Sequence, residues 1–491
     1  MVLDINLFRA DKGGDLDLIR ASQRKRFADE QLVDRVAALD DQWRKAKYAR
    51  DQLSKQLNAI SKQLALHHKA GKNVAEDQAV ARRLKTELEQ ANQQAGRLQA
   101  QRDSALQAVG NLVHHSVPHH RDEAHNQVIS TGGPSPRTRG PEAALLGHAE
   151  LLQRLGLADL EAGAAAAGSR AYFLLNEGVL LNQALIAYGL HFMTQRGWTP
   201  VQTPFWLKAE VMARCAQLSQ FDEELYRLVS SPAKGRPPAT AATPLNGGPL
   251  PAELEAEEDG SGSSRYLIAT SEQALCALHQ GSWLEPQDLP LRYVGLSTCF
   301  RREAGSHGKD TAGIFRVHQF DKVEQFAITA PGQPSWDMLD RMVQTAQDFY
   351  TSLQLPHRSV RVVSGALNLA AAAKVDVEAW FPASETYREL VSASNCTDYQ
   401  ARRLDIRLRS AAPNKSSFQS ADNAGNGFVH MLNCTLTATQ RTLCCLLENH
   451  QTEEGFRVPD VLQPYMHGQD FVKFRKPLRQ AGQLLVSALR K

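Results

Sequence analysis

The sequence predicts an α+β protein in which a long antiparallel helical hairpin precedes a body of mixed strands and helices. Apolar residues recur in steps of three and four over 36–64, and the same steps return over 84–112, beyond a Gly-Lys-Asn segment at 71–73. Such steps are typical of a coiled coil. Farther on, strand-like runs at 291–303 and 313–326 flank a short polar loop with two glycines, which predicts an antiparallel pair of strands.

The first helix of the hairpin has two apolar seams that extend over four heptads. They consist of Val36, Trp43, Leu57 and Leu64, and of Leu39, Ala46, Leu53 and Ile60. We expect the chain to reverse at Gly71, because glycine and asparagine favour turns. At about 40 residues per helix and ~1.5 Å per residue, the coiled-coil arm (about 30–112) should extend ~60 Å. An arm of this length is too long to be buried against a domain of ordinary size.

Positive charge is concentrated in this arm. Positions 42–110 hold 13 Lys and Arg residues and six acidic ones, a net charge of +7, whereas the whole chain carries +3 and the remainder therefore −4. Two interpretations are open. The arm is either a solvated coiled coil that serves as a protein-docking rod, or it follows nucleic-acid phosphates and gains affinity by releasing counterions. Periodicity and charge alone do not choose between them.

Composition narrows the class of protein. The 491 residues are 42% hydrophobic and 22% charged, which predicts about two to four globular domains and excludes a fibrous or wholly disordered chain. No run approaches the roughly 18 apolar residues of a spanning helix, and the first residues lack the pattern of a secretory or organellar signal. Seven cysteines are few and odd in number, as expected for reduced thiols in a cytoplasmic protein with no membrane contact.

Three segments read as interruptions of the globular body. Residues 116–140 turn irregular and rich in His, Gly and Pro, and we interpret them as a linker. Residues 231–264 combine Pro and Gly with an acidic run, which predicts a disordered surface insertion. The basic end at 471–491 is either a frayed tail or an additional RNA contact, and the sequence leaves both open.

The predicted strand pair carries an unusual polar face. Because side chains alternate along a strand, Arg301 and Glu303 should share one face of the first strand. On the second strand the shared face should hold Arg316, His318, Phe320, Lys322 and Glu324. Buried charges need partners, so this face is either a salt-bridged edge or the floor of a ligand site. Arginine, an aromatic ring and carboxylates together suit a nucleotide and a zwitterion.

Three further patterns allow a structural or a functional interpretation. Thr270 and Glu272 fit a helix N-cap with its acid, or two polar groups of a site. Glu389 and Ser392 offer oxygen atoms suited to Mg²⁺, but such spacing also occurs at a strand end. Arg441 should lie roughly two turns into a helix, where it either binds an anion or pairs with Glu448.

Long colinear motifs then resemble the seryl-tRNA synthetases of the eukaryotic cytosolic type. The motifs are VLDINLFR (2–9), YLIATSEQ (266–273), LSTCFRREAGSHGKDTAGIFRVHQFDKVE (296–324), EAWFPAS (378–384), RELVS (388–392), SNCTDYQARR (394–403) and HMLN (430–433). The resemblance covers nearly the whole chain apart from 231–264 and the tail. It implies a class II synthetase domain, built on an antiparallel sheet flanked by helices, and a serine–tRNA ligase that uses ATP and Mg²⁺ without a prosthetic group.

The resemblance also implies roles for individual residues. Arg301 would bind the α-phosphate of ATP and the serine carboxylate, Phe320 would stack on adenine, and Arg441 would lie on the far adenine face near the γ-phosphate. Together with Glu389, the two arginines form the implied catalytic set. The implied serine-binding residues are Thr270, Glu272, Arg301, Glu324, Asn433 and Thr435. Further implied ATP contacts are Arg302, Glu303, Arg316, Val317, His318, Gln319, Glu389, Leu390, Val391 and Ser392, and the metal ligands are Glu389 and Ser392.

Domain organisation and partners follow from the same resemblance. It implies an N-terminal tRNA-binding domain (1–115), a linker and entry to the body (116–170), a catalytic domain (171–470) and the basic tail (471–491). The arm would bind tRNA(Ser), with the selenocysteine tRNA as a further candidate acceptor. A homodimer would form through the helix at 179–195 and the region of Pro204, in the cytoplasm.

The sequence departs from the family's motifs at two positions, and two alternative functions remain open. Lys309 and Ala312 stand where the family usually has arginine, which puts a contact of that loop with the tRNA acceptor end in doubt. One alternative is a relative that kept the fold but lost catalysis. The other is an enzyme that adenylates serine for a carrier protein, with the arm as a docking rod.

Overall fold

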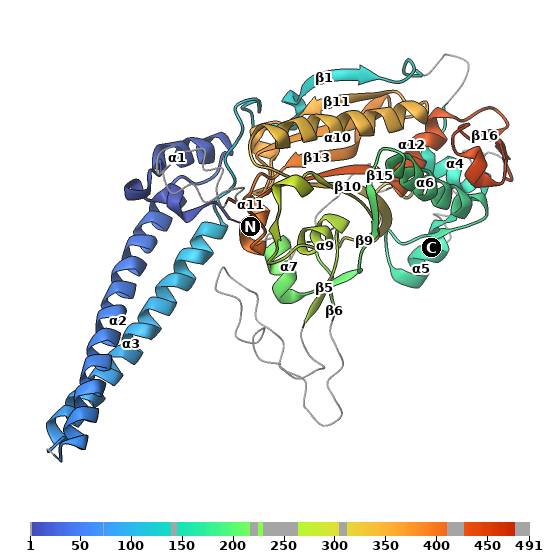
Figure 1. Ribbon diagram of the computed structural model, residues 1–491. Coiled ribbons are helices and arrows are strands. Elements are labelled where there is room, and N and C mark those ends of the chain that lie inside the picture. The colour runs from blue at the N-terminus through green and yellow to red at the C-terminus, as the bar shows by residue number, and fades with distance from the viewer. Residues whose placement is uncertain are drawn as a thin grey trace, which may run out of the picture. The chain divides into compact units, whose positions relative to one another are not determined.

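A computed structural model describes residues 2–71, 73–138, 145–216, 224–228, 264–303, 312–409 and 427–476 (Figure 1). The described chain divides into two compact units, at 2–112 and from 113 onwards. Lys309, residues 231–263 of the predicted insertion and residues 477–491 of the predicted tail lie outside the described residues.

The first unit confirms the helical hairpin. Its elements are η1 (Ile5–Phe8), η2 (Ala10–Lys12), α1 (Leu16–Lys25), α2 (Gln31–Lys69) and α3 (Ala75–Gln107). The second arm helix was predicted to continue to position 112, but it ends at Gln107. The reason is a tertiary contact: Arg26 donates from Nε to the carbonyl of Asn111 at 2.8 Å, and a side chain on Gly110 would collide with Arg26.

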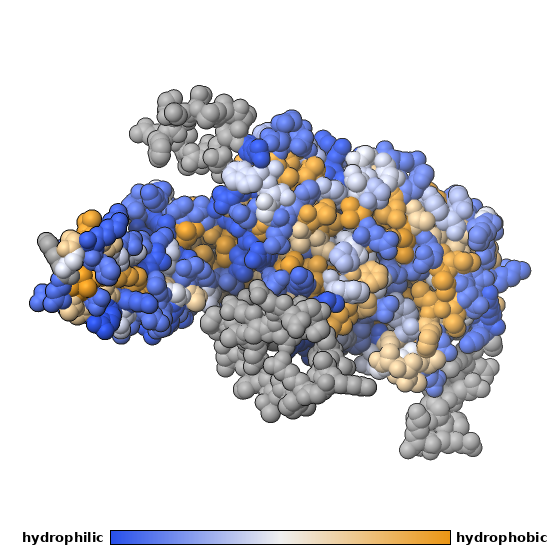
Figure 2. All heavy atoms as spheres, turned by 60° about the horizontal axis from the view of Figure 1, so that its bottom comes forward, coloured by the Kyte–Doolittle hydropathy of each residue, from blue (hydrophilic) through white to orange (hydrophobic). Residues whose placement is uncertain are grey.

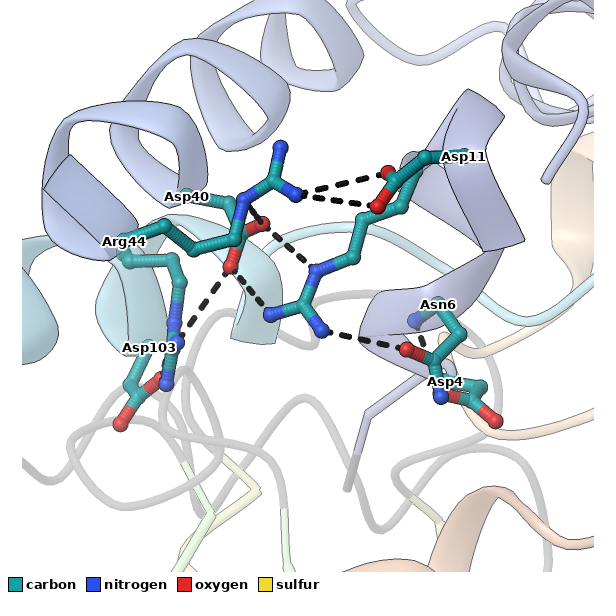
Figure 3. Close-up of polar contacts among 8 residues, drawn as sticks. Asp4, Asn6, Asp11, Asp40, Arg44 and Asp103 are labelled. Carbon is teal, nitrogen blue, oxygen red and sulfur yellow. Dashed lines mark hydrogen bonds and ion pairs between the residues drawn. The ribbon is translucent and has the colours of Figure 1, made fainter. Parts of the chain in front are cut away.

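The root of the hairpin is fastened by a buried carboxylate. Asp40 on α2 is only 2% exposed and accepts from Arg9 Nε at 2.7 Å and from Arg9 Nη2 at 2.8 Å. Arg102 on α3 approaches it to 3.4 Å, and so does Arg44, which also reaches Asp11 (Figure 3). Although burial opposes the shift, the hydrogen bonds from Arg9 lower the pKa of Asp40. One carboxylate therefore ties the N-terminal segment to both arm helices.

The second unit is built on an eight-stranded sheet of order β1-β11-β12-β13-β15-β10-β9-β4, antiparallel except for the β4–β9 pair. Its strands are β1 (Gln127–Gly132), β11 (His357–Arg361), β12 (Ala373–Phe381), β13 (Thr386–Asn395), β15 (His430–Ala438), β10 (Gln319–Thr329), β9 (Leu291–Phe300) and β4 (Thr199–Gln202). The predicted strand pair is therefore real, but both strands were placed wrongly at the loop. Arg301 to Glu303 lie beyond β9, and Gly313 to His318 precede β10, because Glu303 and Gly313 adopt positive φ values of 47° and 67°.

Helices cover both faces of this sheet. One face packs with α6 (Glu177–Thr194), α10 (Gln333–Ser352) and α12 (Thr439–Asn449) into one large apolar core, and Figure 1 shows α10 crossing the sheet. At the β9–β10 end, a second core on the other face includes α7 (Ala209–Cys215), α9 (Ser271–Ala277) and α11 (Tyr399–Leu404). Alternation along β10 serves both cores, since Val323 and Ala327 face the first and Phe326 and Ile328 the second.

Smaller elements complete the unit. They are the helices α4 (His148–Leu155), α5 (Leu160–Ala167), η3 (Glu123–His125), η5 (Pro286–Asp288), η7 (Ser364–Ala366) and η8 (Gln463–Met466), and the strands β2 (Ala158–Asp159), β3 (Phe173–Leu174), β5 (Trp206–Lys208), β6 (Arg227–Leu228), β7 (Arg265–Leu267), β8 (Trp283–Leu284), β14 (Arg407–Leu408), β16 (Gly455–Arg457) and β17 (Phe471–Lys473). The prediction that residues 116–140 form an irregular linker was wrong in part, because β1 lies within this segment and pairs with β11. The prediction of a tail at 471–491 was wrong at its start, because the first residues of this segment form β17, which pairs with β16.

The cysteines and the molecular surface agree with the predictions made from the composition. All seven cysteines are buried free thiols. In the described part of the chain, no helix is long and apolar enough to cross a membrane. The face drawn in Figure 2 is mostly polar with separate apolar patches. The exposed apolar side chains of the second unit include Phe173, Leu175 and Val179, around the start of α6.

Candidate active site

A polar cavity opens where β9, β10, β13 and β15 meet the starts of α9 and α12. Fourteen of the residues to which the resemblance gave roles line it: Thr270, Glu272, Arg301, Glu303, Arg316, Val317, Phe320, Glu324, Glu389, Leu390, Ser392, Asn433, Thr435 and Arg441. They come from six separate stretches of the chain. The polar face therefore forms the floor of a cavity rather than a salt-bridged outer edge.

The first half of β10 supplies one wall of the cavity. Phe320, Lys322 and Glu324 alternate along the strand and all face the cavity. Lys322 Nζ donates to Thr270 Oγ1 at 2.5 Å and forms an ion pair with Glu324. Both side chains of this pair are nearly inaccessible to solvent, at 7% and 2%. A charge pair buried to this degree is held in one arrangement, because either partner alone would be costly to desolvate.

Thr270 and Glu272 serve the helix and the cavity at once. Thr270 is the N-cap of α9 and accepts from the backbone N–H of Glu272 at 3.3 Å. The carboxylate of Glu272 accepts from Gln400 at 2.7 Å and from Asn433 at 3.0 Å. Burial, followed by the nearby charge of Glu324, raises the pKa of Glu272. The two interpretations offered by the sequence are therefore compatible.

Two β-bulges bring odd-numbered and even-numbered residues of one strand to the face of the sheet that lines the cavity. Val377 and Glu378 pair with Val391 and Glu389, so Leu390 is the extra residue of β13. Strict alternation would place Glu389 and Ser392 on opposite faces, and the bulge resets the count. On β15 the pairing skips Leu436, which brings Ala438 to the face of Asn433 and Thr435.

Arginines gather at the other end of the cavity. Arg301 donates from Nε to the carbonyl of Ala269 at 3.3 Å, and its guanidinium lies 5.3 Å from the Phe320 ring centre. Arg316 Nε lies 3.5 Å from a carboxylate oxygen of Glu303. These contacts position two guanidinium groups and an aromatic ring around one space, a combination suited to a phosphorylated ring compound.

Arg441 differs from the sequence prediction in place and partner. It is the third residue of α12 rather than two turns into it. Its Nε donates to the carbonyl of Phe315 at 3.3 Å, and its Nη1 lies 3.8 Å from Glu389 Oε1. Burial lowers the pKa of Arg441, with Arg301 acting in the same direction and Glu389 opposing it. The alternative pairing with Glu448 is wrong, because that carboxylate binds His148 instead.

Glu389 is the carboxylate beside Arg441. Although burial opposes it, the positive charges of Lys374 and Arg441 lower the pKa of Glu389. Its side chain keeps 45% of its surface accessible because it faces the open cavity. Behind it, Lys374 and Asp376 form an ion pair at 3.0 Å. Burial and then Glu389 raise the pKa of Asp376 to about 7.

Four residues of the predicted set do not line the cavity. The backbone N–H of Arg302 binds the carbonyl of Glu224, and the carbonyl of Gln319 accepts from Tyr172. His318 donates from Nδ1 to the carbonyl of Arg301 at 2.9 Å. Val391 is fully buried in the main core. The structure therefore gives their side chains no place in the cavity wall.

Comparisons with known proteins place this cavity in a family. Residues 2–113 match the seryl-tRNA synthetase N-terminal domain, and residues 255–450 match the class II tRNA synthetase core domain (G, H, P, S and T). The chain is 47% identical over 479 residues to the cytoplasmic serine–tRNA ligase of Arabidopsis thaliana, covering 97% of this chain and 98% of that one. The chain belongs to the seryl-tRNA synthetases.

Solved seryl-tRNA synthetases share its structure as well. The chain matches the cytoplasmic serine–tRNA ligase of Naegleria fowleri in complex with AMP, with a TM-score of 0.78, 41% identity and coverage of 97% of this chain and 100% of that chain. It matches the Pyrococcus horikoshii enzyme complexed with ATP, with a TM-score of 0.78, 34% identity and coverage of 96% and 100%. The Arabidopsis and mouse relatives are named as cytoplasmic, in agreement with the expected location.

Sequence reasoning gave no role to several residues that line the synthetase cavity. They include Gln273, Phe315, Lys322, Asn368, Ser394 and Gln440. Strand alternation already placed Lys322 on the correct face, so its role could have been inferred. Lys374 and Asp376 also alternate along β12, and two charges on one face of an apolar strand were a usable signal.

Proposed function

We propose that this synthetase ligates L-serine to tRNA(Ser) in two steps, using ATP to form seryl-adenylate and then transferring serine to the tRNA 3′ end. One observation carries the proposal. A single cavity has Glu272 and Glu324 at one end and Arg301, Arg316 and Arg441 at the other. Carboxylates suit the amino group of serine, and guanidinium groups suit phosphates.

ATP would occupy the arginine end. We assign Arg301 to the α-phosphate and the serine carboxylate, Phe320 to one face of adenine and Arg441 to the other face near the γ-phosphate. The remaining wall of the ATP site would consist of Glu303, Arg316, Val317 and Leu390, with Arg302, His318, Gln319 and Val391 contributing through their backbone. Arg301 lies beside Phe320, which supports a shared contact with one nucleotide.

Serine would occupy the acidic end. We assign Glu272 and Glu324 to its ammonium group, and Thr270, Asn433 and Thr435 to its remaining polar groups. A site whose buried polar groups are paired by the serine hydroxyl rejects alanine, because alanine leaves those groups without partners. Threonine adds only one methyl group, and excluding it by lack of room is weaker, about 1–3 kcal/mol.

The described residues fit a magnesium ion held mainly by phosphates. They contain no cluster of three or more metal-binding His, Cys, Asp or Glu side chains. Mg²⁺ is usually bound by one or two carboxylates together with substrate phosphates and water. Glu389 and Ser392 face the cavity together, and the lowered pKa of Glu389 keeps its carboxylate charged. When bound there, the ion would neutralise charge on the phosphates.

The chemistry requires positioning more than proton transfer. The serine carboxylate attacks the α-phosphate, and pyrophosphate leaves from the opposite side. Charge develops on the phosphate oxygens, where Arg301 and Arg441 would stabilise it. The buried cysteines need no catalytic role, since burial raises the pKa of thiols such as Cys434 and keeps them protonated.

The arm would bind the tRNA. Its net charge of +7 supports phosphate contacts along the hairpin of α2 and α3. We keep the proposed division into a tRNA-binding domain (1–115), an entry segment (116–170), a catalytic domain (171–470) and a basic tail (471–491). The selenocysteine tRNA is a further proposed acceptor, and charging assays with that tRNA test it.

A homodimer would form through α6 and the region of Pro204. The apolar side chains of Phe173, Leu175 and Val179 are 40–49% exposed at the start of α6. Grouped apolar exposure of this kind supports a protein–protein contact. Sedimentation of the purified chain tests this proposal, and a monomer at micromolar concentration would contradict it.

Serine-dependent ATP–pyrophosphate exchange tests the central proposal. We expect exchange with serine and not with alanine, and charging of tRNA(Ser) by the same preparation. A chain without exchange would be the inactive relative. Removal of residues 42–110 should abolish charging while exchange continues. Charging that survives this deletion would contradict the role of the arm, and exchange without any tRNA charging would favour the carrier-protein alternative.

A further inference from the structure

We propose that His148, held by Glu448, is a positioning residue for ATP, acting through the segment 312–316 that leads into β10. Neither His148 nor Glu448 lines the cavity. The inference depends on the proposed function because it names a determinant of ATP binding. It follows from an unbroken series of contacts between a buried carboxylate and Arg441.

The series begins at Glu448, near the end of α12. Its side chain is only 3% exposed, and its Oε1 accepts from the backbone N–H of His148 at 3.0 Å and from the ring Nδ1 at 2.8 Å. The other oxygen, Oε2, accepts from the backbone N–H of Ala383 at 3.1 Å. A buried carboxylate is costly unless it is hydrogen-bonded, and three donors satisfy this one. Glu448 therefore fixes both the start of α4 and the orientation of the His148 ring.

The opposite edge of the ring meets the segment 312–316. His148 Nε2 lies 3.2 Å from the carbonyl oxygen of Ala312. Gly313 has φ +67°, and a Cβ on it would fall 2.8 Å from His148 Cδ2. The ring centre of Phe315 lies 6.2 Å from that of His148, and Phe381 packs edge-on against Phe315. The turn thus lies directly against the imidazole.

The same segment then reaches the ATP end of the cavity. Arg441 donates from Nε to the carbonyl of Phe315 at 3.3 Å, and its guanidinium lies 5.0 Å from the Phe315 ring centre. The next residue, Arg316, lies beside Glu303. A displacement of 312–316 would therefore move Arg316 itself and remove the hydrogen bond that positions Arg441. Apart from Arg301, the serine-binding residues lie at the start of α9, on β10 and on β15, outside this series.

Substitutions can separate the two edges of the ring. In His148→Gln the side-chain amide can reach the Nε2 position and donate to Ala312, whereas in His148→Asn it mimics Nδ1 and serves only Glu448. We expect His148→Ala to raise the KM for ATP in the exchange reaction about tenfold, with the KM for serine within about twofold of wild type. His148→Gln should lie closer to wild type than His148→Asn.

A purely structural role makes a different prediction. It would lower the melting temperature and the active fraction, and hence kcat, without a selective change in the KM for ATP. Direct titration of ATP without serine provides a second readout. Should His148→Ala fail to fold, Gly313→Ala perturbs the same contact from the other side, and we expect the same selective loss of ATP affinity.

The outcomes distinguish this inference from the proposed function. A wild-type chain without serine-dependent exchange would overturn the proposed function itself. A wild-type chain with normal exchange, together with folded His148 and Gly313 variants whose ATP affinity is unchanged, would overturn only the positioning role.

Discussion

The two ends of the cavity use the same residue type in opposite ways. At the acidic end, burial and Glu324 raise the pKa of Glu272. At the arginine end, although desolvation inside the cavity opposes it, Lys374 and Arg441 lower the pKa of Glu389. The acidic end is therefore ready to bind a cation, whereas the arginine end carries positive charge in excess of Glu389 and is ready to bind an anion.

This difference shows that the two ends of one cavity carry opposite net charge, and that charge is not neutralised within each end. Serine is a zwitterion and ATP a polyanion, and each would neutralise the end that it occupies. Apart from Arg301, which is assigned to both substrates, a residue at one end should then affect one substrate and spare the other. The following substitutions test this separation.

The largest loss is expected at the arginine end. Arg301→Lys keeps a positive charge but removes the planar, bidentate guanidinium group beside Phe320. We expect the rate of serine-dependent ATP–pyrophosphate exchange to fall about 10²–10³-fold, because this group would stabilise charge that develops during adenylation. Arg292→Lys, on β9 just before Arg301 in the chain but outside the cavity, is the matched control. An Arg301→Lys enzyme within threefold of wild type would contradict the assignment.

At the acidic end the effect should be smaller and selective. Glu272→Gln removes the charge but retains a similar shape and its place beside Gln400 and Asn433. Loss of one charge-assisted hydrogen bond to the serine ammonium predicts a rise in the KM for serine of about 10–100-fold. The KM for ATP should stay near wild type, as should both constants for the control Glu285→Gln, a half-buried carboxylate outside the cavity. A parallel rise in both KM values would show that the two ends are not separable.

The sequence could predict the parts that depend on local periodicity. Heptad spacing located the hairpin, and alternation along β10 placed Phe320, Lys322 and Glu324 on one face. Local patterns failed where distant residues decide the structure. The end of α3 depends on Arg26, and the shared face of Glu389 and Ser392 depends on a bulge at Leu390. Residue type alone suggested that pair as metal ligands, but strict strand alternation would have placed the two side chains on opposite faces.

Lys322 offers a test of how the acidic end is held together. Lys322→Met leaves Glu324 buried without its cation, and breaking such a pair costs about 3–5 kcal/mol of folding free energy. We expect a clear fall in the melting temperature. The double variant Lys322→Met/Glu324→Gln should recover part of it, since no unpaired charge remains. A double variant as unstable as the single one would mean that Lys322 acts through packing alone.

The smallest effect concerns pH and compares the two carboxylates directly. Only ionised Glu272 attracts the serine ammonium, and its pKa is raised, so the KM for serine should increase on acidification at a higher pH than for an ordinary carboxylate. Glu389 has a lowered pKa and stays ionised over that range, so the KM for ATP should remain constant. Exchange kinetics at a series of pH values between neutrality and the onset of acid unfolding measure both constants. Glu324→Gln removes the like charge beside Glu272 and should move the serine transition to lower pH. If the transition does not move, burial alone sets the pKa of Glu272, and the two acids do not act as a coupled pair.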